Sequence, residues 1–524
     1  MLDSSKLNYY TQQTKSNQFV RIETDLCIYG GTSAGVTAAV QAKRMGLDVV
    51  ILEFGRHLGG MTSSGLGATD IGNKEAIGGI SRQFYRTLGK YYESDEPDGA
   101  AWKFEPSVAE EVFNTWIDEQ GINVFYEQHL ESVQKEAGRI KSIEMENGDV
   151  FSAKIFIDAT YEGDLLAKAG VSYHIGREAN SVYKETLNGI HFGNPNHNFK
   201  SWVDPYVVEG KPDSGLLYGI TNDTLGYQGQ GDSSIQAYNF RICLTDRSDI
   251  KMPFPKPNNY DPNKYALLAR YIDTGVWDAM QLHRVLQNRK TDLNNYGGVS
   301  TDHIGFNYNW AEGDYETREK IFQDHVDYNL GMLYFLSHDE RVPTTIREEV
   351  CSWGLPAGEF PETGGWPHQL YIREARRMIS DCVMTERHCR GYTTAEDSIG
   401  LAAYTMDSHH CRRVIIDGRV INEGNVEISP TAPYPISYQA IVPKEDECSN
   451  LIVPVCLSSS HIAFGSIRME PVFMVLGQSA ATAAALAIED DVSVQHVEYQ
   501  KLRNKLIEDN QVLEWKRNTL STTK

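Results

Sequence analysis

Residues 27–35 read CIYGGTSAG, a pattern suited to binding a phosphate group. A strand that enters a helix through a tight glycine turn exposes backbone N–H groups, and these together with the helix dipole bind a pyrophosphate. Gly30 and Gly35 take the first and third positions of a G-x-G-x-x-G fingerprint. Thr32 replaces the second glycine, so we expect its hydroxyl to donate to phosphate and Gly31 to supply backbone freedom. A tight turn in an ordinary α/β domain is the alternative.

An acidic residue follows at the spacing that a nucleotide ribose requires. Glu53 ends the second predicted strand, and its carboxylate can accept hydrogen bonds from ribose hydroxyl groups. A second glycine-rich stretch, residues 59–65, comes soon after this acid. Two such stretches in succession indicate a cofactor that extends across the domain.

These residues need a βαβ unit to hold them. The sequence predicts a short apolar strand over Asp25–Tyr29, a helix over 34–45 and a second buried strand over Leu47–Glu53. Residues 124–158 predict a small β-meander that ends in a core strand. Pro471 opens a long helix of small residues, which suits close packing against a sheet or a cofactor.

Composition restricts the partners and the compartment. The 524 residues carry 49 basic and 71 acidic side chains, a net charge of −22, which disfavours nucleic acid and anionic membranes. The polar first twenty residues and the absence of a continuous apolar run of about 18 residues predict no secretory signal, no membrane span and a cytoplasmic location. Eight cysteines without a C-x-x-C pair predict no metal site and mostly reduced thiols.

Several motifs together resemble the FAD-dependent oxidoreductases of the glutathione-reductase-like flavoprotein superfamily. More narrowly, they resemble a bacterial FAD-dependent oxidoreductase family linked to sugar metabolism. The motifs are spread over most of the chain: YGGTSAG (29–35), ILEFGRHLGGMTSSG (51–65), FIDATYEGDL (156–165), QAYNFRICLT (236–245), KTDLNN (290–295), QLYIREARRM (369–378), DSIGLAAYTMDSH (397–409), YPISYQAIVPK (434–444) and SSHIAFGSIRMEPVFMVLGQSAATAAALA (459–487).

The resemblance implies FAD as the cofactor and a set of residues around it. The pyrophosphate is expected at Gly30, Gly31, Thr32, Ser33, Ala34 and Gly35, the ribose at Glu53, the path towards the flavin at Arg56, Gly60 and Met61, and further cofactor contacts at Asp158, Ala159, Thr160, Arg468 and Pro471. The helix from Pro471 is expected to point its N-terminal dipole at the flavin and stabilise its reduced form.

The implied fold is α/β: an FAD-binding Rossmann-like domain with a β-meander and an inserted α+β substrate domain. We expect a flexible N-terminal arm at 1–21, the FAD-binding domain at 22–170 and 371–495, the substrate or cap domain at 171–370, and a C-terminal helix with a tail at 496–524. A helix is also predicted over 371–386, with Arg373, Arg376 and Arg377 mainly on its solvated side.

Three side chains are the candidate catalytic residues. A histidine can take the hydroxyl proton of an alcohol near neutral pH, and His461 and then His409 lie beside family-like motifs. Arg241 shares one face of a predicted strand with Asn239 and is a candidate substrate anchor. Structural histidines bonded to the backbone, and an arginine paired with a surface acid, are the alternatives.

The preferred function is oxidation of a CH–OH group in a small sugar- or polyol-like molecule. The aromatic and amide-rich texture of 186–310 and the polar stretch Lys290–Asn295 favour a hydroxylated substrate, although a solvated loop is an equal reading of that stretch. Two alternatives stay open: reduction of an activated C=C bond in a carboxylate, and a non-catalytic flavin-binding electron-transfer subunit. A homo-oligomer is also left open.

Overall fold

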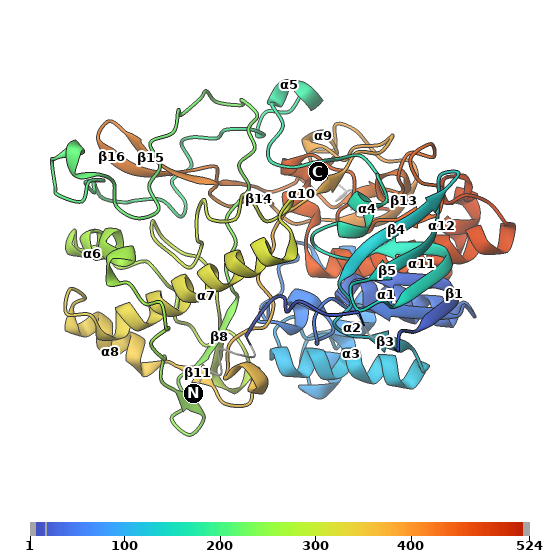
Figure 1. Cartoon of the computed structure of the whole chain (residues 1–524), viewed down its shortest axis with the longest axis horizontal. Coiled ribbons are helices and arrows are strands. Elements are labelled where there is room, and N and C mark those ends of the chain that lie inside the picture. The colour runs from blue at the N-terminus through green and yellow to red at the C-terminus, as the bar shows by residue number, and fades with distance from the viewer. Residues whose placement is uncertain (1–6, 16–17, 517–524) are drawn as a thin grey trace, which may run out of the picture.

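The computed structural model describes residues 7–15 and 18–516. The protein has two lobes, and long segments of the chain pass between them (Figure 1). Residues 1–6 and 16–17 of the expected arm and residues 517–524 of the expected tail lie outside the described residues. One lobe holds a sheet of seven strands in the order β3-β2-β1-β6-β5-β4, with β19 added beside β6. The strands are β1 (Arg21–Tyr29), β2 (Val49–Leu52), β3 (Asn123–Phe125), β4 (Leu130–Glu136), β5 (Arg139–Met145), β6 (Val150–Asp158) and β19 (Leu451–Ile452).

The sheet confirms the predicted parallel α/β core and the meander. β1 pairs in parallel with β2 and β6, whereas β4, β5 and β6 pair antiparallel. Because side chains alternate along a strand, Leu26 and Ile28 of β1 pack in the core cluster that contains the helices. Cys27 and Tyr29 pack in the second cluster, under the meander. The opposite faces of one strand are therefore both buried, and the end of β1 is held rigidly.

The helices of this lobe cover one face of the sheet (Figure 1). They are α1 (Ser33–Arg44), α2 (Gly79–Tyr91), α3 (Pro106–Gln120), α11 (Glu470–Asp490) and α12 (Tyr499–Glu508), with the short α4 (Asp164–Lys168) on the other side of β6. The helix predicted to pack closely against a sheet or a cofactor lies against another helix, α1: small residues allow this approach, because a Cβ on Gly477 would stand 2.2 Å from the Ala34 carbonyl oxygen. The Thr37 hydroxyl donates to the Met474 carbonyl at 3.0 Å across this contact.

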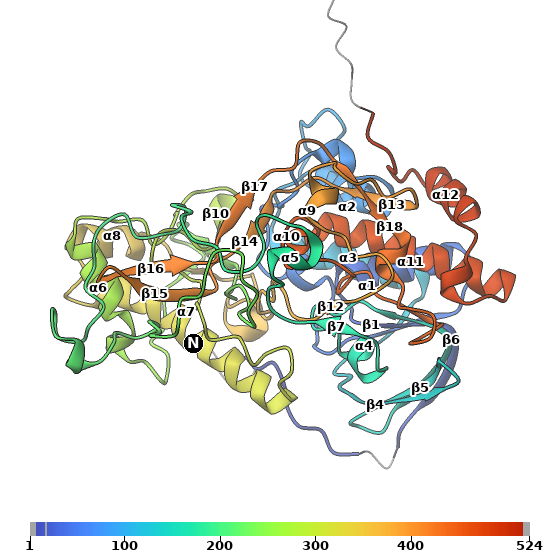
Figure 2. The ribbon, with the colours of Figure 1, turned by 90° about the horizontal axis from the view of Figure 1, so that it is seen from above.

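The other lobe is built from short elements around the long helix α7 (Figure 2). Its helices are α6 (Ala266–Asp273), α7 (Tyr315–His338) and α8 (Thr344–Ser352). Its strands pair two by two: β8 (Ile242–Thr245) with β10 (Lys290–Leu293), β9 (Lys251–Met252) with β11 (Leu355–Pro356), β14 (Met406–Ser408) with β17 (Val426–Ile428), and β15 (Arg412–Ile416) with β16 (Arg419–Glu423). The β15–β16 hairpin thus lies in this lobe although it falls within 371–495.

The remaining elements lie where the two lobes meet or on the outer side of α11. They are α5 (Asn180–Tyr183), α9 (Glu386–Cys389), α10 (His461–Ile467), and the strand pairs β7 (Tyr173–His174) with β12 (Arg377–Met378) and β13 (Ser398–Ala402) with β18 (Tyr434–Ser437). The 3-10 helices are η1 (Gly60–Ser63), η2 (Lys74–Ala76), η3 (Pro212–Ser214), η4 (Pro262–Tyr265), η5 (Gln287–Arg289), η6 (Pro361–Thr363), η7 (Tyr438–Ile441) and η8 (Val494–His496).

Two sequence predictions need correction. No helix forms over 371–386; the backbone there is extended through β12 and becomes helical only at α9. Arg373, Arg376 and Arg377 are buried rather than solvated, because each pairs with a carboxylate from a distant segment.

Within the described residues α11 is long and apolar enough to cross a membrane, and 89% of its most apolar stretch lies inside the protein, as expected for a core helix.

Candidate cofactor pocket and active site

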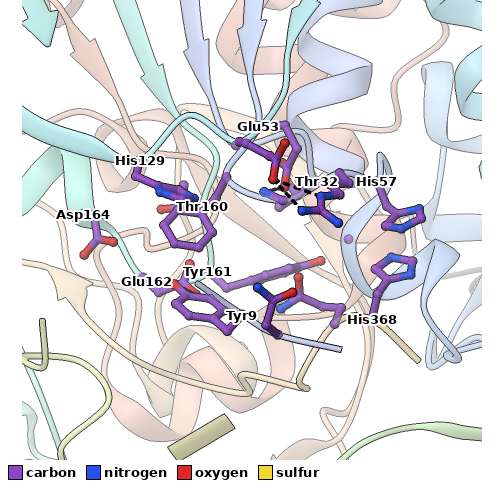
Figure 3. Close-up of a pocket in the computed structure, with 18 of the residues that line it drawn as sticks. Tyr9, Thr32, Glu53, His57, His129, Thr160, Tyr161, Glu162, Asp164 and His368 are labelled. Carbon is purple, nitrogen blue, oxygen red and sulfur yellow. Dashed lines mark hydrogen bonds and ion pairs between the residues drawn. The ribbon is translucent and has the colours of Figure 1, made fainter. Parts of the chain in front are cut away.

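A deep pocket opens at the carboxyl ends of β1, β2 and β6 (Figure 3). It encloses about 1090 Å³, counting its open mouth. Gly30 and Thr32 after β1, Glu53 after β2 and Thr160 after β6 lie in its wall. Ligands of open α/β sheets bind at this edge, so the topology alone makes it the first candidate for a binding site.

The glycines of the first loop are required by backbone contacts. Gly30 has a φ of +104°, and a Cβ there would stand 2.8 Å from the Ala159 and Thr160 backbone. A Cβ on Gly35 would stand 1.9 Å from the Gly30 carbonyl oxygen. Because β1 and α1 approach this closely only without side chains, the loop forms the tight strand-to-helix turn that a pyrophosphate site requires.

Thr32 has a different role from the one predicted. It is the N-cap of α1, and its hydroxyl donates to the Ala159 carbonyl at 2.7 Å while accepting from the Gly35 N–H at 3.4 Å. Its hydroxyl hydrogen therefore points to β6 and not to a phosphate. The N–H groups of Ser33 and Ala34 belong to the first turn of α1 and have no acceptor within the helix, so they are the donors suited to an anion.

Glu53 is held rigidly at the end of β2. One carboxylate oxygen accepts from the Gly31 N–H at 2.6 Å and the other from the Gly55 N–H at 2.7 Å. Burial raises the pKa of Glu53, and these two backbone donors oppose the rise. A carboxylate fixed in this way keeps lone pairs for ribose hydroxyls, so Glu53 fits the predicted role.

One buried carboxylate next to the pocket residue Tyr161 links several segments. Glu470, the first residue of α11, accepts from the hydroxyls of Ser33 at 2.6 Å, Thr62 at 2.7 Å and Tyr161 at 2.7 Å. The Tyr161 hydroxyl in turn accepts from the Met61 N–H at 2.9 Å. The N-termini of α1 and α11, η1 and the segment after β6 therefore meet at one point, and burial raises the pKa of Glu470 there.

The predicted cofactor residues divide into two groups. Gly30, Thr32, Glu53, Arg56, Gly60 and Thr160 line the pocket. The other predicted residues are not among those that line the pocket: Gly31, Ser33, Ala34, Gly35, Met61, Asp158, Ala159 and Pro471 belong to the elements around it, and Arg468 lies in a separate cluster. Asp158, for example, accepts from the Thr160 hydroxyl at 2.6 Å and from the Leu166 N–H at 2.9 Å, which fixes the turn after β6.

Sequence reasoning missed several pocket residues. His57 and His368 line the pocket and stack with ring centroids 3.9 Å apart (Figure 3). Tyr161 and Glu162 stand in the FIDATYEGDL motif, directly after a predicted strand, and that position was a usable signal. Tyr9 gave no signal, because nothing in the sequence connects residue 9 with this edge of the sheet.

A second polar cluster surrounds the Tyr371 ring. The guanidinium groups of Arg373, Arg468 and Arg241 lie 4.6, 5.8 and 5.9 Å from its centroid. Arg468 also donates to the Tyr371 hydroxyl at 2.9 Å. We call these four residues, together with Asp70, Asp292, Asp302, Asp407 and His409, the Tyr371 cluster. The predicted anchor Arg241 and the predicted cofactor residue Arg468 are both members.

Each arginine of the cluster has a carboxylate partner. Arg241 binds Asp292 through two N–H groups, at 2.7 and 2.5 Å, and Asp70 at 3.2 Å. Arg373 lies 2.9 Å from an Asp302 oxygen, and Arg468 lies 3.1 Å from an Asp407 oxygen. The Nε atoms of Arg373 and Arg468 are buried without a hydrogen-bond partner among the described residues. The cluster is close to charge balance and still offers two unused donors.

His409 lies between two of these carboxylates. Its Nδ1 is 2.7 Å from Asp302 and its Nε2 is 3.5 Å from Asp407. His409, Arg468 and Arg373 lower the pKa of Asp407 against the effect of burial, so Asp407 stays ionised.

His461 is not in the loop predicted for it. It is the first residue of α10 and is fully buried, with Nδ1 2.7 Å from Glu374 and Nε2 2.9 Å from the Ser408 hydroxyl. Burial lowers the pKa of His461 to about 3. Both ring nitrogens are already engaged inside the protein, so His461 is poorly placed to take a proton from a substrate.

The stretch Lys290–Asn295 is not a solvated loop. Lys290–Leu293 form β10, and the buried Lys290 ammonium binds Glu105 at 2.5 Å and Glu359 at 2.6 Å.

All eight cysteines are free, and all except Cys351 and Cys382 are buried. Among the described residues no group of three or more histidine, cysteine or acidic side chains is arranged to hold a metal ion.

Two stretches of chain connect the pocket with the Tyr371 cluster. The first begins at Gly60 in the pocket wall and reaches Gly65, where a Cβ would stand 1.9 Å from the Arg241 carbonyl oxygen. The second runs from Arg468 in the cluster to Glu470, which accepts a hydrogen bond from the pocket residue Tyr161. The pocket wall and the cluster are therefore joined by short segments of backbone.

Comparison with known proteins places the chain in a family. A comparison with curated proteins gave no match. Solved structures with partial likeness include the OxyS anhydrotetracycline hydroxylase from Streptomyces rimosus (13% identity, TM-score 0.25, 30% of this chain and 36% of that one) and L-proline dehydrogenase from P. horikoshii (15%, 0.24, 30% and 59%). The match thus spans only about a third to three fifths of those chains, and such TM-scores carry no further argument.

The sequence profile of the FAD dependent oxidoreductase family matches residues 25–506, which include every strand and helix that forms the pocket except the first residues of β1. The glycine turn, the free amides of α1 and the fixed Glu53 are what an FAD site of this kind needs. The chain belongs to the FAD-dependent oxidoreductase family: it is an enzyme, and FAD is its cofactor.

Proposed function

We propose that FAD lies in the pocket at the carboxyl ends of β1, β2 and β6, and that the enzyme oxidises a CH–OH group of a small hydroxylated substrate at the Tyr371 cluster. The Ser33 and Ala34 amides would hold the pyrophosphate and Glu53 the ribose. FAD supplies hydride acceptance when it is bound. The parallel sheet with its meander supports the narrower assignment to the glutathione-reductase-like superfamily.

One observation supports the chemistry most directly: His409 is held between Asp302 and Asp407 beside the arginines. Its Nδ1 contact with Asp302 is short, 2.7 Å, while its Nε2 is 3.5 Å from Asp407 and is the freer nitrogen. We assign His409 Nε2 as the atom that takes the hydroxyl proton, with Asp302 orienting the ring and stabilising its charged form. The Nε–H groups of Arg373 and Arg468 would hold substrate oxygens.

Reduction of an activated C=C bond is the second candidate, because the structure gathers three guanidinium groups that the sequence did not show to be clustered. Such a reductase needs unpaired positive charge for a carboxylate. Here Asp70, Asp292, Asp302 and Asp407 already neutralise the arginines, which favours an uncharged polyol. The non-catalytic alternative is set aside because the family is one of enzymes.

The test is anaerobic bleaching of the flavin absorbance with a panel of sugars and polyols, beside a panel of enoates offered to the reduced enzyme. We expect a polyol to bleach the flavin, and His409→Gln to slow that bleaching by about 10²-fold or more while FAD stays bound. His461→Gln is the matched control and should slow it much less. A flavin that no polyol bleaches and that an enoate reoxidises would overturn the proposal.

A further inference from the structure

The N-terminal segment 7–11 is anchored to α7, in the lobe opposite the sheet. Leu7 is buried in the main core, and its carbonyl oxygen accepts from the Gln323 side chain at 2.7 Å. The N–H groups of Tyr9 and Tyr10 donate to one Glu319 oxygen at 2.7 and 2.9 Å. A segment expected to be loose is thus held here by several contacts.

The same segment then continues towards the meander (Figure 2). The Tyr10 hydroxyl donates to Glu146 at 3.0 Å, and Gln13 donates to the Glu127 carbonyl at 2.7 Å. Lys15 lies 2.9 Å from Glu144. Residues 7–15 therefore cross from one lobe to the other and have no helix or strand of their own.

The crossing passes over the cofactor pocket. Asn8, Tyr9 and Thr11 line it, and Figure 3 shows Tyr9 among the lining side chains. The Tyr9 ring stacks on Phe54 with centroids 4.6 Å apart and an interplanar angle of 25°. Tyr9 and Trp310 are arranged edge to face, with ring centroids 4.8 Å apart. Phe54 directly follows Glu53, so Tyr9 lies beside the place proposed for the ribose.

We propose that residues 7–11 form a strap that closes the pocket over bound FAD and slows its release. The strap precedes residues 25–506, so the family profile does not include it. Its anchors are the buried Leu7 side chain, the aromatic contacts of Tyr9 and separate polar contacts, and it has no sheet or helix of its own, so it can open as a unit when these contacts break. This inference rests on the proposed position of FAD in the pocket.

Release of FAD from the purified holoenzyme tests the strap by the rise of flavin fluorescence after dilution. Tyr9→Ala removes the ring that covers the pocket, and Glu319→Gln weakens the anchor without touching the pocket. We expect both variants to release FAD roughly tenfold faster or more, from loss of an aromatic contact or of a charged hydrogen bond. Tyr227→Ala, an exposed tyrosine elsewhere, is the matched control and should leave the rate unchanged.

A second readout is independent of flavin release. Bound FAD should protect the bonds after Tyr9 and Tyr10 from chymotrypsin, as followed by intact mass, and Glu319→Gln should remove the protection. Unchanged release in both variants, or tighter binding in Tyr9→Ala, would overturn the strap. If a Gly30→Val variant that still folds retains FAD with wild-type affinity, the proposed position of FAD fails instead.

Discussion

The substitution Glu53→Gln tests the cofactor position most directly. Glutamine keeps the length and shape of the side chain but turns one carboxylate oxygen into an NH₂ group. Because Gly31 and Gly55 each donate to a different oxygen, at 2.6 and 2.7 Å, one of these N–H groups must then face a donor. A ribose hydroxyl that donates to the carboxylate also loses its charged acceptor.

The expected loss in FAD binding follows from these contacts. A hydrogen bond to a charged group contributes about 1.5–3 kcal/mol, so the Kd for FAD should rise by roughly 10- to 150-fold. Fluorescence titration of the apoenzyme measures the change. Glu127→Gln is the matched control, because Glu127 also lines the pocket but is half exposed and pairs with the exposed Arg56. The Kd of this variant for FAD should rise less than about fivefold.

The reasoning would be refuted by a particular pair of results. If Glu53→Gln lowers the thermal stability of the apoenzyme but leaves the Kd for FAD within threefold of wild type, Glu53 only supports the turn and the ribose lies elsewhere. If the two glutamine variants weaken binding equally, general loss of negative charge explains the effect and the fixed geometry of Glu53 does not.

Three further outcomes are expected. Arg241→Met should lower the free energy of unfolding in urea by about 3–5 kcal/mol, because it leaves Asp292 charged and buried, and adding Asp292→Asn should recover part of the loss; no change would mean that the pair is not buried as described. Between pH 6.5 and pH 4, His461→Gln should reduce the decrease in the free energy of unfolding that acidification causes. The folded pKa of about 3 lies below the unfolded value near 6.5, so in this pH range only the unfolded chain takes up a proton at His461. An unchanged pH profile of stability would contradict this. Gly477→Val should lower the free energy of unfolding by about 1–3 kcal/mol or more and weaken FAD retention, because the valine side chain would push α11 away from the Ala34 carbonyl oxygen. Wild-type stability of this variant would show that the two helices can separate freely.

The local parts of this site could be predicted from the sequence. The turn at Gly30–Gly35, the acid at Glu53 and the helix after Pro471 each depend on backbone geometry within one strand–turn–helix unit, and short-range spacing records that geometry. The meander was also predictable, since alternation and turn residues lie within 35 positions.

The long-range parts were not predictable in the same way. Residues 371–386 have a helical period, but Arg376 and Arg377 find Asp164 and Glu178, about 200 positions earlier, and burial of these ion pairs outweighs helix propensity. Arg373 likewise forms a buried ion pair with an acid outside its own segment, Asp302. A single sequence does not show which distant acid faces which arginine, so it could not locate the Tyr371 cluster or rank His409 above His461.

The contact between α1 and α11 has a consequence for synthesis of the chain. Ser33 and Glu470, and likewise Thr37 and Met474, are 437 positions apart in the sequence. At translation rates of about 5–20 residues per second, the apolar side of α1 waits roughly 20 to 90 s after its own emergence before α11 covers it. The lobe that holds the sheet therefore completes last although it begins first, and during this interval the nascent chain exposes an unpaired apolar helix face that favours aggregation.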